Sequence, residues 1–327
     1  MPVIARNRLL AAGMFFAFAL AHADPCPCAP RYPERPVTML VGLAAGGAND
    51  LIARALAEAT KAYFPQPITI INKPAGGGSL ATAELVQARA DGYTLIMGYG
   101  PAFTFQPYLT PHLPYKGPKD FSMVTGVAIV PLIIAGRSDA PWKGMQEFLD
   151  YAKKNPGKIR LGTGGIGSLG HIVGEDLKQA AQVDITLVPF SGAATAITAM
   201  LGGHVEAVHS NPSPLMGHLR AGTIRNLAIY EEKRVARFPD VPTLRELSYD
   251  VVTRGSYYFV AGPKGLPGEL IQTLHNAFSK ALRSEKFQKF AQDNVLIVDS
   301  KGPEDLRQRL EADYSFYGEF VKRVKVQ

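Results

Sequence analysis

Short β-rich runs recur along this chain, and each ends in a turn of glycine or other small residues that leads into a helical pattern. The first unit covers residues 37–61, where the turn Ala44-Ala45-Gly46-Gly47 separates an apolar run from a helix with apolar residues at helical spacing. Later units carry the turns Gly76 to Ser79, Gly162 to Ser168 and Ser191-Gly192. Strands that alternate with helices are typical of parallel sheets covered on both faces. The pattern predicts an α/β protein whose mainly parallel sheets are flanked by helices.

The length and composition favour two domains, each with its own hydrophobic core. The chain has 327 residues, of which 46% are hydrophobic, and this is enough for two ordinary domains. The formal net charge of +7 is spread diffusely, without a basic stripe interleaved with aromatics, so nucleic acid is not expected as a partner. Cys26 and Cys28 are the only cysteines, which excludes a disulfide framework or a cysteine metal site from the main body. Neither cysteine is assigned a function.

The first 23 residues have the pattern of an export signal. Arg6 and Arg8 precede an apolar run over residues 9–20, and Ala21-His22-Ala23 is a small-x-small cleavage sequence. A helix over that run would be about 18 Å long, which is shorter than the roughly 30 Å hydrocarbon core of a membrane. We expect cleavage after Ala23 and export of the chain to a bacterial periplasm.

The glycine turns are candidate anion-binding sites. A turn that delivers the chain into a helix presents unpaired backbone N–H groups at the positive end of the helix dipole. Open α/β sheets bind ligands at the edge where such turns lie. Any one of these turns could simply be a tight connection that requires glycine. Four of them, divided between the two predicted halves, favour a binding function.

Nucleotide binding is a weaker interpretation of the same turns. Gly165, Gly167 and Gly170 fit the spacing G-x-G-x-x-G, but the next strand ends Val188-Pro189-Phe190, without the acidic residue that would hold a ribose. The only Gly-Lys pair, Gly157-Lys158, is followed by isoleucine, so a phosphate-binding P-loop is absent. We expect no cofactor.

A hydrolase that uses Ser168 is an alternative function. Ser168 and His171 lie close in sequence, but a nucleophile elbow would require glycine where Ile166 stands, and no acidic third member is evident. A serine in the first turn of a helix is more often a cap or a ligand hydrogen-bond donor. His171, His204 and His209 lack the spacing of metal ligands. We therefore expect neither catalytic residues nor a metal site.

Several motifs stand in a fixed order along the mature chain. They are Tyr32-Pro33 with Pro36, Gly46-Gly47 with Asp50 and Ala53-Arg54, Asn72-Lys73-Pro74-Ala75-Gly76-Gly77, Asp91-Gly92-Tyr93-Thr94-Leu95, Gly167-Ser168 with His171 and Glu175, Pro189-Phe190-Ser191-Gly192, and Pro239-Asp240-Val241-Pro242-Thr243. Together they resemble the periplasmic solute-binding receptors of tripartite tricarboxylate transporters, also called Bug proteins. One departure is Gly42-Leu43-Ala44-Ala45, which replaces a proline-containing approach to the first glycines.

The resemblance implies a two-lobed, hinged receptor that holds a small organic carboxylate in the cleft and delivers it to a membrane permease. It implies a first lobe over residues 24–127, a second lobe over 128–252 and a return segment over 253–327. Such a receptor would be a monomer without enzymatic activity. An exported sensor that signals without transport remains an alternative. The site residues carried over from the family's motifs are Gly46, Gly47, Asp50, Gly167, Ser168, Ser191, Gly192 and Ala193.

Two further residues are candidates from their positions after strands. Tyr99 follows a strand of the first half and could form an aromatic wall, although core packing explains it equally well. Asn211 lies in Ser210-Asn211-Pro212, where its amide could reach the cleft or cap a turn.

Overall fold

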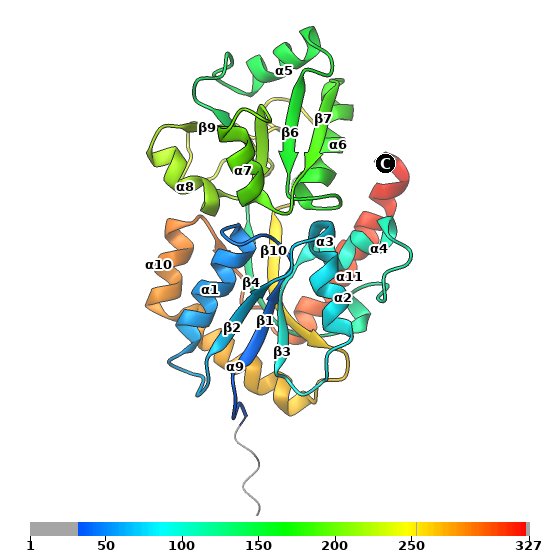
Figure 1. The fold of residues 1–327 in the computed structure, drawn as a ribbon, viewed down its shortest axis with the longest axis vertical. Helices are drawn as coiled ribbons and strands as arrows, with labels where there is room; N and C mark the ends of the chain where they lie inside the picture. The colour runs from blue at the N-terminus through cyan, green and yellow to red at the C-terminus, as the bar shows by residue number, and fades with distance from the viewer. Residues whose placement is uncertain (1–31, 253, 325–327) are drawn as a thin grey trace, which may run out of the picture.

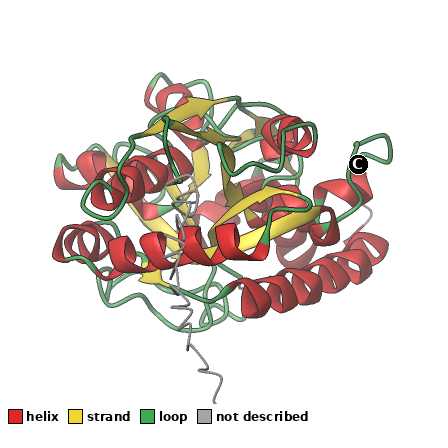
Figure 2. Ribbon diagram, turned by 90° about the horizontal axis from the view of Figure 1, so that it is seen from below, coloured by secondary structure: helices red, strands yellow, loops and turns green. Residues whose placement is uncertain are grey.

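Two β-sheets, one in each lobe, organise the chain in the computed structural model, which describes residues 32–252 and 254–324 (Figure 1). The predicted signal peptide, its cleavage point, Cys26 and Cys28 lie outside the described residues. Helices lie on both sides of the strands, as Figure 2 shows. The two-lobed α/β class is therefore confirmed.

The first lobe is built on a six-stranded sheet with the order β11-β4-β10-β3-β1-β2. Strands β1, β2 and β3 are parallel, as the repeated strand-turn-helix units predict, but β10 and β11 join the sheet in antiparallel pairings. The sheet is consequently mixed. The elements before the crossing to the second lobe are β1 (Val37–Val41), α1 (Ala48–Thr60), β2 (Ile68–Asn72), η1 (Gly76–Gly78), α2 (Ser79–Val86), β3 (Thr94–Tyr99), α3 (Gly100–Thr104), α4 (Gln106–Leu109), η2 (Pro118–Asp120) and β4 (Phe121–Val130).

The second lobe is built on a five-stranded sheet with the order β7-β6-β8-β5-β9. Strands β6, β7 and β8 are parallel, and β5 is antiparallel to both of its neighbours. The elements of this lobe are β5 (Ile133–Arg137), α5 (Met145–Lys154), β6 (Ile159–Thr163), α6 (Leu169–Ala181), β7 (Ile185–Pro189), α7 (Ala193–Leu201), β8 (Ala207–Ser210), α8 (Pro212–Arg220) and β9 (Ile224–Ile229).

The chain then returns to complete the first lobe. The returning elements are β10 (Ser256–Pro263), α9 (Gly268–Arg283), α10 (Glu285–Asp293), β11 (Ile297–Val298) and α11 (Pro303–Val324). Helix α11 runs back up beside the second lobe, and its end lies near α6 (Figure 1). None of the helices in the described ranges combines the length and the apolar character needed to cross a membrane.

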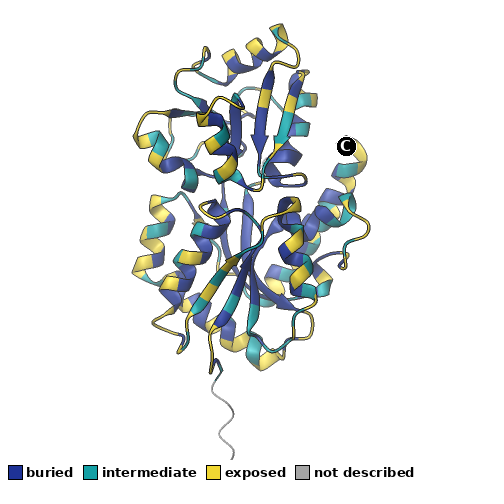
Figure 3. Cartoon of the chain, in the orientation of Figure 1, coloured by how far each residue is buried: buried dark blue, intermediate teal, exposed yellow. Residues whose placement is uncertain are grey.

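Buried side chains run from one lobe into the other. The larger buried cluster contains Met39 and Phe259 of the first sheet together with Leu161 and Ile172 of the second lobe. A smaller cluster, which includes Ile197 and Leu215, fills the face of the second sheet under α7 and α8. Figure 3 shows the strands largely buried, with the exposed residues on the outer faces of helices such as α5 and α10. The lobes therefore share a hydrophobic junction.

The apolar run over residues 127–135 forms parts of two strands in different sheets. Strand β4 ends at Val130 in the first sheet and β5 begins at Ile133 in the second. Pro131 stands between them, and because proline has no backbone N–H it cannot continue the ladder of hydrogen bonds. One continuous apolar run in the sequence therefore serves two sheets, and its residue types do not mark the change of sheet.

Asn211 holds this crossing together. Its side-chain N–H groups donate to the carbonyl oxygen of Pro131 at 2.8 Å, to that of Val130 at 3.3 Å and to the Ser256 hydroxyl at 3.1 Å. Its carbonyl oxygen accepts from the Tyr258 hydroxyl at 2.7 Å. Asn211 therefore joins the start of α8 in the second lobe to both β4 and β10 of the first, and its side-chain N–H groups are engaged by these protein acceptors.

We expect Asn211→Ala to destabilise the protein strongly. The substitution leaves the Tyr258 hydroxyl and two carbonyl oxygens buried without their partner, at about 1–3 kcal/mol for each buried group left unpaired. Urea unfolding measures the loss. Asn276→Ala, on the exposed side of α9, is the matched control and should change the free energy of unfolding by less than about 0.5 kcal/mol. Equal unfolding midpoints for the two variants would contradict this role of Asn211.

Candidate functional site

The predicted glycine turns of the two lobes meet directly. The backbone N–H of Ala44 in the first lobe donates to the carbonyl oxygen of Ser191 in the second at 3.2 Å. The side-chain amide of Gln106 donates to the carbonyl oxygens of Gly76 and Ile166, each at 2.6 Å, and these belong to opposite lobes. We call this geometry the closed arrangement.

Two glycines permit this close approach. A Cβ atom at Gly77 would lie 2.7 Å from the Ile166 carbonyl oxygen, and one at Gly192 would lie 2.8 Å from the Ala44 nitrogen. Gly77 also has a φ of 59°, in the left-handed region that favours glycine. Contact between the lobes at these turns therefore depends on the absence of side chains.

The first turn is fixed by its own carboxylate. Asp50 accepts hydrogen bonds from the Gly46 N–H at 2.9 Å and from Nε of Arg54 at 3.0 Å, and the Gly47 N–H donates to the Ala44 carbonyl oxygen at 3.2 Å. Burial would raise the pKa of Asp50, but the hydrogen bonds from Arg54 and Gly46 lower it overall. Asp50 is thus an anion that shapes the turn, and the N–H groups of Gly46 and Gly47 are used within it.

The second turn ends in a cap on α6. The Ser168 hydroxyl accepts from the His171 N–H at 3.3 Å, and the Gly167 N–H donates to Nδ1 of His171 at 3.4 Å. A Cβ atom at Gly164 would lie 3.7 Å from the Ser168 hydroxyl oxygen and 3.8 Å from the Ala193 nitrogen. The start of α6 and the start of α7 therefore face the same point of the turn.

The third turn leads into α7. The Ser191 hydroxyl lies 3.3 Å from the Thr195 hydroxyl, and the Thr195 hydroxyl donates to the Gly192 carbonyl oxygen at 2.8 Å. Gly192 is the N-cap residue of α7 and Ala193 is its first residue. The first N–H groups of a helix have no acceptor within the helix, so those of α7 are available at the junction.

Tyr99 bridges the lobes through its hydroxyl. The Leu169 N–H donates to the Tyr99 hydroxyl oxygen at 2.7 Å, and the Tyr99 ring stacks on that of Tyr258 with centroids 5.7 Å apart. Burial raises the pKa of Tyr99, so the phenol stays neutral. Tyr99 therefore contacts the start of α6 from the first lobe, and only 5% of its surface is exposed.

The structure adds polar residues that the sequence did not single out. Gln106 is one, since its amide joins the lobes. Asn49 in the first turn of α1 and Thr163 at the end of β6 are fully buried, and their side-chain polar atoms have no hydrogen-bond partner. The hydroxyl of Ser213, a buried residue in the first turn of α8, also has no hydrogen-bond partner. Asn49 lies inside the motif Gly46 to Asp50, which is the one signal that could have drawn attention to it.

No serine-hydrolase geometry is present at Ser168. Its hydroxyl caps α6, and Nδ1 of His171 receives the Gly167 N–H instead of facing the serine hydroxyl. The other nearby imidazole, His209, lies 2.7 Å from the Gly170 carbonyl oxygen through Nδ1 and 2.8 Å from the Tyr230 hydroxyl through Nε2. Across residues 32–252 and 254–324, no three metal-ligating side chains gather in one place.

The comparisons with known proteins agree on one family. The family model described as the tripartite tricarboxylate transporter family receptor matches residues 52–322. Protein BugT of Bordetella pertussis is 32% identical over 281 residues, which cover 85% of this chain and 86% of that protein.

Comparison with solved structures indicates the same family. The periplasmic binding protein BugD superimposes with a TM-score of 0.87 at 30% identity, covering 90% of this chain and 99% of that chain. MatC from Rhodopseudomonas palustris with bound malate gives a TM-score of 0.84 at 29% identity, covering 89% of this chain and 100% of that one. A second R. palustris protein, Rpa4515 with adipate, gives 0.85 at 27% identity, covering 90% and 99%.

We expect His209 to make the stability of the protein pH-dependent. Burial lowers the pKa of His209 to about 3, whereas an unfolded chain has a histidine pKa of about 6.5. The unfolded state therefore binds a proton that the folded state does not, and stability falls as the pH drops from about 6.5 toward 3. This one group should contribute a loss of about 2 kcal/mol between pH 7 and pH 5.

Urea unfolding of the wild type and of His209→Gln at both pH values measures this contribution. The variant should lose less stability than the wild type over the same interval, whatever its absolute stability. The same loss in both proteins would show that His209 is not the group responsible.

Proposed function

Because this chain belongs to the TctC family, the periplasmic solute-binding receptors of tripartite tricarboxylate transporters, we propose that it captures a small organic carboxylate between its lobes and delivers it to a membrane permease. The family consists of receptors that perform no catalysis. The observation that carries the proposal is the meeting of the starts of α6 and α7 with the first-lobe turns at one junction. The known carboxylate ligands of MatC and Rpa4515, malate and adipate, support the ligand class.

In this proposal, peptide N–H groups and small hydroxyls of the second lobe hold the carboxylate. Ser168, with Gly167 before it, offers a hydroxyl at the start of α6. At the start of α7, Ser191 offers a hydroxyl, and Gly192 and Ala193 offer backbone N–H groups. Helix N-termini favour anions through their unpaired N–H groups and the positive end of the dipole. No buried cation is needed to neutralise the guest.

The first-lobe residues have a different part in the proposal. Asp50 holds the turn of Gly46 and Gly47 in shape, and its negative charge would repel a carboxylate in direct contact. The guest would then meet the first N–H groups of α1, which have no acceptor within that helix. Tyr99 positions α6 from the first lobe, and Asn211 acts at the crossing between the lobes.

Closure couples ligand capture to a change of shape. The bonds from Ala44 to Ser191 and from Gln106 to Ile166 join opposite lobes and exist only while the turns meet. A ligand held by both lobes binds the closed arrangement more tightly than an open one, and this difference in affinity shifts the population toward closure. The closed receptor is the form that a permease would recognise.

The unpaired side chains of Asn49 and Thr163 favour a polar guest. A buried polar group without a partner costs about 1–3 kcal/mol. A guest with hydroxyl or carboxyl groups beyond its first carboxylate, or water held with it, would supply the missing bonds. We therefore place a dicarboxylate or a hydroxy acid ahead of a purely hydrocarbon acid.

A thermal-shift screen of the chain without residues 1–23 tests the proposed function. Malate, adipate and aromatic acids form the panel, and the diamides of malate and adipate are the uncharged controls. A ligand at 100 times its Kd stabilises the folded state by about 2.7 kcal/mol and raises the Tm. At least one carboxylate should do so while its diamide does not. A Tm raised by a dinucleotide and by no carboxylate would refute the receptor function.

Gly192→Ala should weaken binding by preventing closure. The added Cβ would lie 2.8 Å from the Ala44 nitrogen and 2.9 Å from the Ala44 Cβ. Gly192 has an extended backbone with a φ of 166°, so alanine adds no strain within its own turn. We expect a Kd at least about tenfold higher by isothermal titration calorimetry, which corresponds to about 1.4 kcal/mol.

Gly217→Ala is the matched control, because a Cβ at Gly217 meets no atom within 4 Å. It should leave the Kd unchanged. If Gly192→Ala also bound the ligand with wild-type affinity, contact between the turns would not be part of ligand capture.

A further inference from the structure

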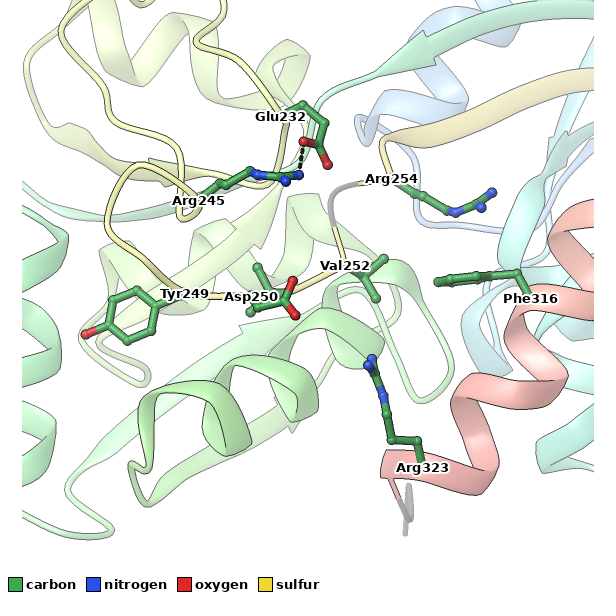
Figure 4. Close-up of a pocket in the computed structure, with 9 residues that line it drawn as sticks. Glu232, Arg245, Tyr249, Asp250, Val252, Arg254, Phe316 and Arg323 are labelled. Carbon is green, nitrogen blue, oxygen red and sulfur yellow. Dashed lines mark hydrogen bonds and ion pairs between the residues drawn. The ribbon is translucent and has the colours of Figure 1, made fainter.

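The linker that returns from the second lobe to the first contacts one helix in each lobe. The Val252 N–H donates to the Asp176 carboxylate of α6, in the second lobe, at 2.7 Å. Two residues later, Arg254 pairs with Asp313 of α11, in the first lobe, and its guanidinium lies 4.2 Å from the centroid of the Phe316 ring. Figure 4 shows Val252, Arg254 and Phe316 at this place. The linker thus lies between α6 and α11.

The end of α11 reaches across to α6 itself. Nη2 of Arg323 lies 3.5 Å from the Asp176 carboxylate, and the two residues belong to different lobes. The Asp176 side chain is 7% exposed, whereas that of Arg323 is 63% exposed. A cavity of about 490 Å³ lies beside Arg323, and Arg245 and Asp250 also line it (Figure 4). Asp176 is therefore a buried carboxylate whose opposite charge comes from the other lobe.

Helix α6 connects this pair to the glycine turns. Its N-cap residue, Ser168, precedes Asp176 by eight residues, a distance of about 12 Å along a helix. The helix is held to its own sheet, because the Gly170 carbonyl oxygen bonds His209, and His209 bonds Tyr230. Because α6 is one continuous helix, a displacement of Asp176 also displaces Ser168 at its start.

We propose that Arg323 is a positioning residue that stabilises the closed arrangement through Asp176 and so slows the release of ligand without touching it. The inference rests on the proposed function for the identity of its ligand. The contact between Arg323 and Asp176 does not depend on that function. Opening of the lobes would leave the Asp176 carboxylate buried with the Val252 N–H as its bonding partner and with Asp250 as a nearby like charge. An uncompensated buried charge is unfavourable, which favours the arrangement that keeps Arg323 in place.

Arg323→Gln should raise the population of open lobes before any ligand is added. Spin labels on Gln146→Cys in α5 and Gln272→Cys in α9, both exposed positions, report the distance between the lobes in a chain whose Cys26 and Cys28 are replaced by serine. The variant should shift this distance distribution toward longer values. Lys322→Gln is the matched control, since Lys322 pairs with Glu319 within α11, and it should not shift the distribution.

Ligand release gives the second readout. With a carboxylate found by the thermal-shift screen, Arg323→Gln should raise the dissociation rate about fivefold, the lower end of typical coupling between sites, with less change in association. Arg323→Lys should release the ligand more slowly than Arg323→Gln, because lysine keeps the positive charge. Asp176→Asn should raise the dissociation rate as Arg323→Gln does. A variant that carries both changes should release the ligand little faster than either single variant.

Wild-type distances and release rates in Arg323→Gln would overturn the inference. The distance measurement needs no ligand, so it decides the role of Arg323 even if no carboxylate binds. Absence of carboxylate binding to the wild type would instead refute the proposed function.

Discussion

Close contact between backbone atoms of opposite lobes is the constraint on which the rest of this structure depends. Ala44 and Ser191 share a hydrogen bond, and Gly77 and Gly192 allow the turns to meet where any side chain would collide. Peptide groups form these contacts, with the Gln106 and Tyr99 side chains beside them, so the strands and helices that end there set much of the geometry. In the proposed function, the fixed dipoles of these peptide groups would hold the anion once the lobes have closed.

The polar groups around the junction divide into those that shape it and those that remain unsatisfied. Asp50, Asn211 and Tyr99 form hydrogen bonds with protein partners and hold the turns and the crossing strands. Asn49 and Thr163 are buried without partners. Buried polar atoms are rarely left unpaired in proteins, and in the proposed function a polar guest would supply the missing partners.

Much of the fold follows from local pattern, since apolar runs, glycine turns and helical spacing are properties of neighbouring residues. Ser168 caps α6, as a serine in the first turn of a helix is expected to. Helix α5 begins at Met145, after Trp142, whose ring packs against those of Phe148 and Tyr151. The antiparallel return of β10 was not predictable, because its partners lie over 100 residues away in the sequence.

The sequence by itself determined the family, the two-lobed class and the turns that end at helix N-termini, because each depends on short motifs and on their order. The tertiary structure alone decided which groups of those turns are already bonded: the amides of Gly46 and Gly47 serve Asp50 and Ala44, and the amide of Asn211 serves the crossing strands. It alone also revealed Gln106 and Arg323 as links between lobes. Hydrogen bonds and ion pairs between residues 60 to 150 positions apart leave no periodicity in a chain, so they become visible only when the lobes are placed together.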